Sequence, residues 1–318
     1  MDEQRKNPGR LICPSTRRFY QESRASKNHS MWDFIHGYIY GRWTYTYIRV
    51  AKGKHPAAKV LGSLFKAISY LFPKSKVDPH KSSSVSNGKI TFADGYHGKV
   101  MPLEGASKLV TINQPINMPD LEQVIPYKRA KDIILENPDH IAVLKCPCRS
   151  AMEKPCQPED VCLAIGEPFT SFIVEHHPDK ARRITQQEAV EIMEAEEKLG
   201  HVHHAFFKDA MLDRFYAICN CCSCCCGAIN AHRNGTPMLA SSGYASEVDR
   251  ELCIGCGICS GFCQFDAIDM VDGKARVDFE KCMGCGVCAS KCEQKAIRFR
   301  LEPSKGKPLD ICLYLLSF

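Results

Sequence analysis

The sequence predicts an α+β protein built of three parts. The first part is a basic, aromatic-rich helical region. The second is a small cysteine-rich α/β unit, in which strand and helix patterns alternate. The third is a short cysteine pattern that occurs twice in succession. At 318 residues the chain is long enough for two or three domains. We place the parts at residues 1–88, 89–245 and 246–303, followed by a tail at 304–318.

Cysteine is the unusual feature of the composition. The chain has 20 cysteines, and 18 of them fall into four short groups that leave Cys13 and Cys312 alone. Closely spaced groups of this kind are typical of metal binding rather than of a disulfide framework. The first ten residues lack the apolar core of a secretory signal, and no apolar run reaches the roughly 20 residues of a membrane span. We therefore expect a cytoplasmic protein of a reducing, anaerobic environment.

The N-terminal region carries most of the positive charge. Residues 1–80 contain 15 Lys and Arg against 5 Asp and Glu, although the net charge of the chain is only +6. Such asymmetry indicates a partner or a surface. Apolar residues at helical spacing predict an amphipathic helix over 57–72, which either packs on the protein's own core or lies at a membrane surface or a partner. We expect any such contact to use residues 31–72, and we expect no nucleic acid.

The middle region follows a Ser-rich linker at 81–88. Pro126 suits the first position of a helix, and Thr185 with Glu188 forms a capping box for a helix that Gly200 ends. The predicted elements are strands at 89–93 and 109–112, a helix at 126–136, strands at 141–144 and 169–174, a helix at 185–199 and a strand at 214–218.

Two of the predicted strands run directly into a Cys-x-Cys motif. The strand at 141–144 precedes Cys146-Pro147-Cys148, and the strand at 214–218 precedes Cys219-Asn220-Cys221. If these strands are parallel in one sheet, their carboxyl ends lie at one edge, where open α/β sheets bind ligands. We therefore expect the two cysteine groups to face each other across a shared site.

The densest group is the segment 219–226, in which six of eight residues are cysteine. Successive side chains of an extended segment point in opposite directions, so one core could not hold them all. Adjacent cysteines rarely reach disulfide geometry. A metal or iron–sulfur centre is the better interpretation. Its candidate ligands are the ten cysteines of the middle region: Cys146, Cys148, Cys156, Cys162, Cys219, Cys221, Cys222, Cys224, Cys225 and Cys226.

The most specific pattern is C-x2-C-x2-C-x3-C, which occurs at 253–263 and again at 282–292. It resembles the bacterial-type ferredoxin domain with two [4Fe–4S] clusters, in which the fourth cysteine of each run binds the other cluster. The resemblance implies one ligand set of Cys253, Cys256, Cys259 and Cys292, and a second of Cys282, Cys285, Cys288 and Cys263.

The repeat departs from the ferredoxin family at one position in each run. The family usually has proline after the fourth cysteine, whereas this chain has Gln264 and Glu293. Because proline is not a ligand, we expect ligation to survive. Between the runs, Asp272-Gly273 predicts a hairpin turn that joins strands at 268–271 and 274–277.

The middle region also resembles a group of uncharacterised anaerobic 4Fe–4S proteins, over roughly residues 126–300. The matching motifs are Cys-Pro-Cys-Arg at 146–149, Cys156 and Cys162, the helix from Thr185, Gly-x-Val-His at 200–203, and the cysteines of 219–226. In this group the segment precedes a two-cluster ferredoxin domain, and the resemblance implies clusters but no reaction.

Ten cysteines exceed the eight that two cubanes require. One interpretation is two further [4Fe–4S] clusters with two spare cysteines. A second is one cluster, with the other cysteines forming a persulfide, disulfide or zinc site, and a third is a larger or non-cubane cluster.

A few polar residues near the cysteines have two interpretations each. Arg149 either hydrogen-bonds cluster sulfur or a bound anion, or is a surface charge. His201, His203 and His204 either satisfy the end of the preceding helix or act as ligands or proton donors. P-loop, dinucleotide-binding, haem-attachment and radical-SAM motifs are absent from the sequence.

We therefore expect an iron–sulfur electron-transfer protein that exchanges electrons with a partner oxidoreductase. Its cofactors would be two ferredoxin-type [4Fe–4S] clusters and one or two further clusters. One alternative is an oxidoreductase, in which the ferredoxin domain feeds a substrate-binding cluster or thiol site. Another is a redox or metal sensor. A carrier needs every cluster to be coordinatively closed, whereas an enzyme needs a pocket and a non-cysteine group at the central cluster.

Overall fold

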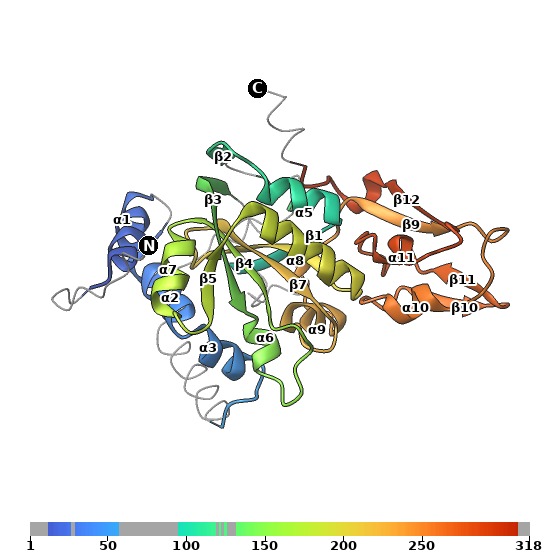
Figure 1. Ribbon diagram of the computed structural model, residues 1–318, viewed down its shortest axis with the longest axis horizontal. Coiled ribbons are helices and arrows are strands. Elements are labelled where there is room, and N and C mark those ends of the chain that lie inside the picture. Colours follow the sequence, from blue (N-terminus) through green and yellow to red (C-terminus); the bar gives the residue numbers. More distant parts are fainter. Residues whose placement is uncertain are drawn as a thin grey trace, which may run out of the picture.

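The computed structural model describes residues 12–26, 29–56, 95–118, 121, 124–125 and 132–310. Figure 1 shows a central sheet with helices on both faces and a smaller unit at one end, so the fold is α+β as predicted. None of the helices in the described ranges combines the length and apolarity that crossing a bilayer requires. The predicted helix over 57–72, the linker at 81–88 and the strand at 89–93 lie outside the described residues.

Within the described residues, the central sheet has eight strands. Its hydrogen-bonded order is β2 (Ile116–Met118), β3 (Ile133–Lys145), β4 (Asp160–Glu167), β7 (Arg214–Cys221), β6 (Val202–Lys208), β1 (Tyr96–Met101) and β8 (Leu239–Ala240), with β5 (Ala181–Ile184) paired to β3. Among the paired strands described in this sheet, only β1 and β8 are parallel. The sheet is therefore mainly antiparallel, and the parallel sheet of an α/β unit is not what forms.

Strands β3 and β7 nevertheless run in the same direction. Strand β4 lies between them and is antiparallel to both, in register Leu144 to Cys162 and Cys162 to Cys219. Two antiparallel steps restore the original direction, so β3 and β7 end at the same edge of the sheet. The expectation of a shared edge is confirmed, although the neighbouring strands are not parallel.

Helices cover both faces of the sheet. One face packs against α5 (Leu103–Val110) and α8 (Gln186–Lys198) through a core that includes Leu109, Met193 and Phe207. At the start of α8 the Thr185 side chain accepts a 3.1 Å hydrogen bond from the Glu188 N–H, which is one half of the predicted capping box, whereas the Glu188 carboxylate pairs with Arg182. The opposite face carries α1 (Pro14–Ala25), α2 (Met31–Arg42), α3 (Thr44–Ala51), α7 (Phe169–His176) and α9 (Gly227–Arg233).

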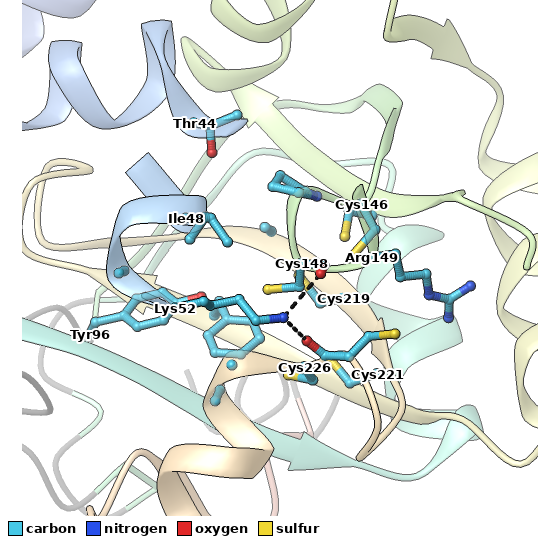
Figure 2. A pocket seen from close by; sticks show the side chains of 18 of the residues that line it. Thr44, Ile48, Lys52, Tyr96, Cys146, Cys148, Arg149, Cys219, Cys221 and Cys226 are labelled. Carbon is cyan, nitrogen blue, oxygen red and sulfur yellow. Dashed lines mark hydrogen bonds between the residues drawn. The ribbon is translucent and has the colours of Figure 1, made fainter. Parts of the chain in front are cut away.

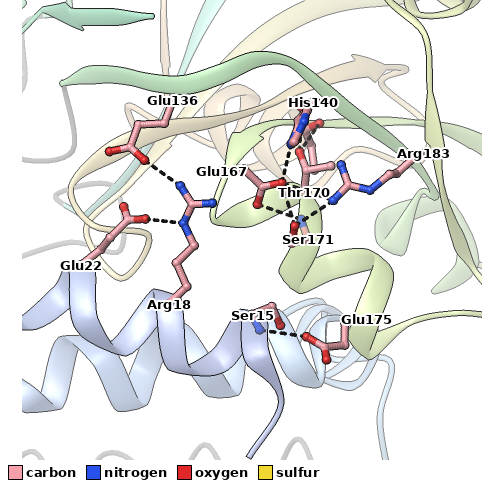
Figure 3. A network of polar contacts seen from close by, with 11 residues as sticks. Ser15, Arg18, Glu22, Glu136, His140, Glu167, Thr170, Ser171, Glu175 and Arg183 are labelled. Atoms are coloured by element: carbon pink, nitrogen blue, oxygen red, sulfur yellow. Dashed lines mark hydrogen bonds and ion pairs between the residues drawn. The ribbon is translucent and has the colours of Figure 1, made fainter. Parts of the chain in front are cut away.

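Polar contacts attach α1 to the central sheet and to α7 (Figure 3). Arg18 of α1 forms ion pairs with Glu22, at 3.1 Å, and with Glu136 of β3, at 2.6 Å. The Ser15 N–H donates a 3.0 Å hydrogen bond to Glu175 of α7. The buried ring of Phe19 lies 5.5 Å from Phe172 of α7, which adds an apolar contact to the polar ones. The N-terminal helices are thus part of the central unit.

Three predicted elements are wrong. Residues 169–174 form helix α7, because Phe169, Phe172 and Ile173 are buried at helical spacing. Short apolar runs do not distinguish strand from helix by periodicity. Leu109 belongs to the last turn of α5, so the strand at 109–112 is absent. The helix predicted up to Glu136 is contradicted by β3, which begins at Ile133.

The smaller unit contains two pairs of antiparallel strands. Strand β9 (Tyr244–Val248) pairs with β12 (Ile297–Leu301), and β10 (Ile268–Val271) pairs with β11 (Lys274–Val277). Asp272 and Gly273 have φ values of 51° and 70°, as a type I′ turn requires, and the predicted hairpin is confirmed. The helical turns of this unit are α10 (Ile258–Phe262), α11 (Val287–Ser290) and η3 (Pro303–Lys305).

Candidate metal centre

The eight cysteines of the repeat border two separate cavities. One cavity is lined by Cys253, Cys256, Cys259 and Cys292, and the other by Cys263, Cys282, Cys285 and Cys288. The fourth cysteine of each run therefore lies with the first three of the other run. These are the two sets that the resemblance implies, and ligation itself stays a prediction.

The loops around these cavities depend on close backbone contact. Gly255 has a φ of 73°, and a Cβ placed there would lie 1.9 Å from the carbonyl oxygen of Gly273. Gly284 has a φ of 64° and leaves similar room for the carbonyl oxygen of Tyr244. Backbone N–H groups reach the sulfurs, for example from Ala275 to Cys253 at 3.5 Å and from Ala267 to Cys263 at 3.3 Å.

The ten central cysteines divide into a ring of six and a group of four. We call the first set the six-thiol ring, and it consists of Cys146, Cys148, Cys162, Cys219, Cys221 and Cys226. These thiols come from the ends of β3 and β7, from β4, and from the starts of α6 (Pro147–Ser150) and α9. The remaining four, which we call the four-thiol group, come from the loop before β4 and the turn after β7: Cys156, Cys222, Cys224 and Cys225.

The thiols of the six-thiol ring influence one another pairwise around the whole set. The interacting pairs are Cys148 with Cys146, Cys146 with Cys162, Cys162 with Cys219, Cys219 with Cys221, and Cys221 with Cys226. An electrostatic interaction between Cys148 and Cys226 closes the ring. Both strand-end motifs, Cys146-Pro147-Cys148 and Cys219-Asn220-Cys221, therefore contribute to one centre.

Two thiols of the ring are set to ionise near neutral pH. A hydrogen bond with Cys162, assisted by one with Cys221, lowers the pKa of Cys219 to about 7. A hydrogen bond with Cys221, assisted by the N–H groups of Ile229 and Ala228, lowers the pKa of Cys226 to about 7. The thiolate is the form that binds metal, so Cys219 and Cys226 are the ring thiols most readily available as ligands, whereas neighbouring thiols and burial raise the pKa of the other four.

A cavity of about 550 Å³ lies against the six-thiol ring (Figure 2). Its other walls are largely aromatic and aliphatic, with Tyr40, Tyr96, Tyr216 and Phe169 among them. The charged residues that line the cavity, within the described part of the chain, are all cations: Lys52, Lys54, Arg149 and Lys208. A pocket of this size and lining can bind a small molecule beside the thiols.

Lys52, directly after α3, joins the N-terminal helices to the cysteine loops. Its ammonium group donates a 3.1 Å hydrogen bond to the Cys148 carbonyl and a 2.6 Å hydrogen bond to the Cys225 carbonyl (Figure 2). Its charge also contributes to the lowered pKa of Cys226. The N-terminal region thus supplies one wall of the site.

Polar side chains other than cysteine also line the cavity. The Tyr40 and Tyr216 hydroxyls are 2.9 Å apart, and the Lys208 ammonium lies 5.0 Å from the centre of the Tyr40 ring. Burial raises the pKa of both phenols above the usual value, so they stay protonated at neutral pH. These groups can donate hydrogen bonds to a bound molecule.

Arg149 is buried, so its interpretation as a surface charge is wrong. Its guanidinium pairs with the buried carboxylate of Glu196, donates to the Pro158 carbonyl, and donates at 3.1 Å to the Asn220 carbonyl. The His201 Nδ1 also contacts Glu196, at 2.7 Å. Arg149 therefore connects α6 to α8 and to β7, and its hydrogen bonds go to acceptors of the protein itself.

His201, His203 and His204 are all buried, and burial keeps His203 and His204 neutral at pH 7. Burial lowers the pKa of His203 to about 4 and that of His204 to about 3. His203 also hydrogen-bonds through Nδ1 to the Asn220 side chain, at 2.6 Å. Because Asn220 lies between Cys219 and Cys221, His203 supports the cysteine strand from the neighbouring strand β6.

The smaller unit is joined to the central unit beside Cys263. The Gln264 side chain accepts a 2.7 Å hydrogen bond from the Ser223 N–H and donates a 2.9 Å hydrogen bond to the Gly200 carbonyl. Proline, which the ferredoxin family usually has here, could make neither side-chain bond. Arg233 and Asp266 add an ion pair of 2.7 Å, and Lys291 donates to the Lys198 carbonyl at 2.6 Å.

The second cysteine set of the repeat also shares a hydrophobic core with the six-thiol ring. Cys221, Cys226 and Cys282 are buried in one cluster, against which Cys219, Cys263 and Cys285 pack. Phe265 lies in the same cluster and continues the contact from Cys263 toward the central sheet. The two cysteine centres therefore border one continuous packed interior.

Comparison with known proteins gives a match to one part of the chain. A model of the 4Fe-4S dicluster domain family matches residues 245–293, which contain both runs of the repeat. No curated protein matches the chain. The C-terminal unit is thus similar to iron–sulfur dicluster domains, and the match supports iron–sulfur electron transfer.

Sequence reasoning missed several residues of the site. Lys52 and Tyr40 are far from the cysteines in sequence, and no motif marks them. The sequence does mark Gln264 as unusual, because it replaces the proline that the ferredoxin family usually has. Its hydrogen-bond partners, Ser223 and Gly200, are known only from the folded chain.

The buried Arg149–Glu196 pair should dominate the stability of this region. Replacing Arg149 by Met leaves the Glu196 charge buried without its main partner and should lower the free energy of unfolding by about 3–5 kcal/mol. The Arg149→Met/Glu196→Met double variant should recover part of that loss. Urea unfolding of the anaerobic protein measures both.

A matched control is Arg182→Met, which removes the more exposed ion pair with Glu188 at the other end of α8. It should cost about 1 kcal/mol or less. Equal losses for Arg149→Met and Arg182→Met would contradict the role of the buried pair.

Proposed function

We propose that this protein is an iron–sulfur electron carrier in which two ferredoxin-type clusters exchange electrons with a further cluster at the six-thiol ring. The observation that carries the proposal is the core shared by the second cysteine set and the ring. A redox centre is useful to another only if the two are close, and here cysteines of both centres belong to one continuous buried cluster. The lining of the two smaller cavities supports the ligand sets Cys253, Cys256, Cys259 and Cys292, and Cys263, Cys282, Cys285 and Cys288.

The number of irons tests this proposal. Two cubanes account for about eight irons per chain, and a cluster at the six-thiol ring should raise the count to about twelve, with a matching rise in sulfide. Replacing Cys221 by Ser should return the count toward eight and remove one EPR signal from the reduced protein. Anaerobic purification with iron and sulfide analysis makes the measurement.

Cys13→Ser provides the control, because Cys13 belongs to none of the four cysteine groups. It should leave the iron count unchanged. A wild-type count of about eight, with no further EPR signal, would eliminate the ring cluster.

Gln264 should set how well electrons pass between the two units. Gln264→Ala removes the side-chain hydrogen bonds that Gln264 makes with Ser223 and Gly200, so exchange of the Ser223 amide hydrogen should become about tenfold faster. Reduction of the ring cluster should slow, while reduction of the two ferredoxin clusters should not. Hydrogen exchange and stopped-flow absorbance would follow the two effects.

Glu293→Ala is the matched control, since Glu293 occupies the equivalent place after Cys292 but is exposed. If Glu293→Ala slows reduction of the ring cluster as much as Gln264→Ala does, the junction at Gln264 is not the route.

A second candidate function is an oxidoreductase, and the cavity of about 550 Å³ beside the six-thiol ring favours it. An enzyme needs a pocket and a non-cysteine group at the central cluster, and Tyr40, Tyr216 and Lys52 provide such groups. An open iron would bind cyanide, so cyanide should perturb the EPR signal that depends on Cys221. An unchanged signal would favour the carrier.

We further propose that residues 31–72 contact a redox partner or a membrane surface. Helix α2 supports this, because large apolar side chains at four-residue spacing are exposed along it and at its end. They are Met31, Ile35, Ile39 and Trp43, together with Trp32, whose exposed fraction is 78%. Exposed aromatic and aliphatic residues along one side of a helix suit an interface.

A further inference from the structure

The four-thiol group is more compact than the other cysteine sets. The sulfurs of Cys156, Cys222, Cys224 and Cys225 all lie within 4.8 Å of one another. In the part of the chain that the structure describes, this is the only set of three or more His, Cys, Asp or Glu side chains gathered so closely as a metal site. Neither the six-thiol ring nor the two ferredoxin-type sets reach this closeness.

Sulfur spacing distinguishes a single ion from a cluster. A tetrahedral ion with metal–sulfur bonds of about 2.3 Å holds its four sulfurs about 3.8 Å apart. A cubane keeps its cysteine sulfurs farther apart, because each sulfur binds a different iron. The Cys224 and Cys225 sulfurs are 3.7 Å apart, as one shared ion requires. Those of Cys156 and Cys224 are 2.8 Å apart, so they would separate slightly around an ion.

The backbone around the four-thiol group is held by contacts that do not use the sulfurs. The Cys226 N–H donates to the Cys222 carbonyl at 2.9 Å, which closes the turn after β7. Lys52 holds the Cys225 carbonyl, and Gln264 accepts from the Ser223 N–H. Cys156 approaches from a separate loop, between α6 and β4. An ion would therefore join two segments that are distant in sequence.

The position of the group suits an ion that enters from solvent. Cys224 is exposed and Cys156 is half-buried, while Cys222 and Cys225 are buried. The nearby Lys52 ammonium offsets part of the negative charge that four thiolates leave around a divalent ion. With four protein sulfurs, coordination is complete, as in structural tetrathiolate sites.

We propose that Cys156, Cys222, Cys224 and Cys225 form a mononuclear site for one thiophilic divalent ion, zinc or iron, which is separate from the iron–sulfur clusters. The ion ties the loop before β4 to the turn after β7 and so fixes one rim of the cavity. The six-thiol ring is then left as the central cluster site. The inference goes beyond electron transfer, because the ion has a structural role and need not change its redox state.

The test measures zinc, iron and acid-labile sulfide in the full chain purified without oxygen. Cys224→Ser and Cys156→Ser should each lose about one metal ion per chain, with no loss of sulfide. Cys156→His should retain the ion, since Cys3His sites also bind zinc. Cys13→Ser should have no effect. If the ion is iron, Mössbauer spectroscopy should show one mononuclear high-spin site, and if it is zinc, cobalt substitution should give intense thiolate-to-cobalt absorption.

Two outcomes would overturn the proposal. Loss of about four irons together with sulfide in Cys224→Ser would mean that the four thiols hold a cluster. A Cys156–Cys224 disulfide in the anaerobic protein, with no metal lost on substitution, would mean a redox pair in place of an ion. Both results are independent of the ring cluster, whose presence depends on Cys221, so failure here and failure of the proposed function are distinguishable.

Discussion

The position of β4 between β3 and β7 is the constraint on which the central site depends. Because β4 is antiparallel to both neighbours, the two strands that end in Cys-x-Cys point the same way. Their cysteines then meet at one edge, and Cys162 of β4 lies between them. Without that arrangement, Cys146 and Cys221 would lie at opposite ends of the sheet, and the ring of sulfur contacts could not close.

When several of these thiols ionise close together, the negative charge of the thiolates requires compensation. Several elements of the fold provide it. Backbone N–H groups at the start of α9 favour the ionised form of Cys226, and Lys52 adds a cation. Arg149 acts one layer farther out, where it neutralises Glu196 and holds the backbone of Asn220. The lysines that line the cavity place further positive charge beside the ring. An anionic metal centre and an anionic small molecule would both be favoured by this charge distribution.

The junction between the two units also depends on a few residues that each make several contacts. One side chain, Gln264, links the loop of Cys263 to the turn that carries the four-thiol group, while its other end holds the carbonyl after α8. The contact lies beside the second cysteine set and near the six-thiol ring. The same short segment therefore orders the smaller unit against the sheet and places two cysteine centres in one interior.

The repeat could be predicted almost completely from the sequence, because its geometry is local. The short spacings and the Asp272-Gly273 turn determine which loops form, and the hairpin has the predicted bounds. Periodicity was less informative in the central unit, where residues 169–174 form a helix and 133–136 a strand, since short apolar runs suit either state. The ten central cysteines divide into the six-thiol ring and the four-thiol group because of the strand order and because separate loops meet at the edge of the sheet. These are contacts between residues far apart in the chain, such as Cys156 with Cys224 and Lys52 with Cys225, and only the tertiary structure decides them.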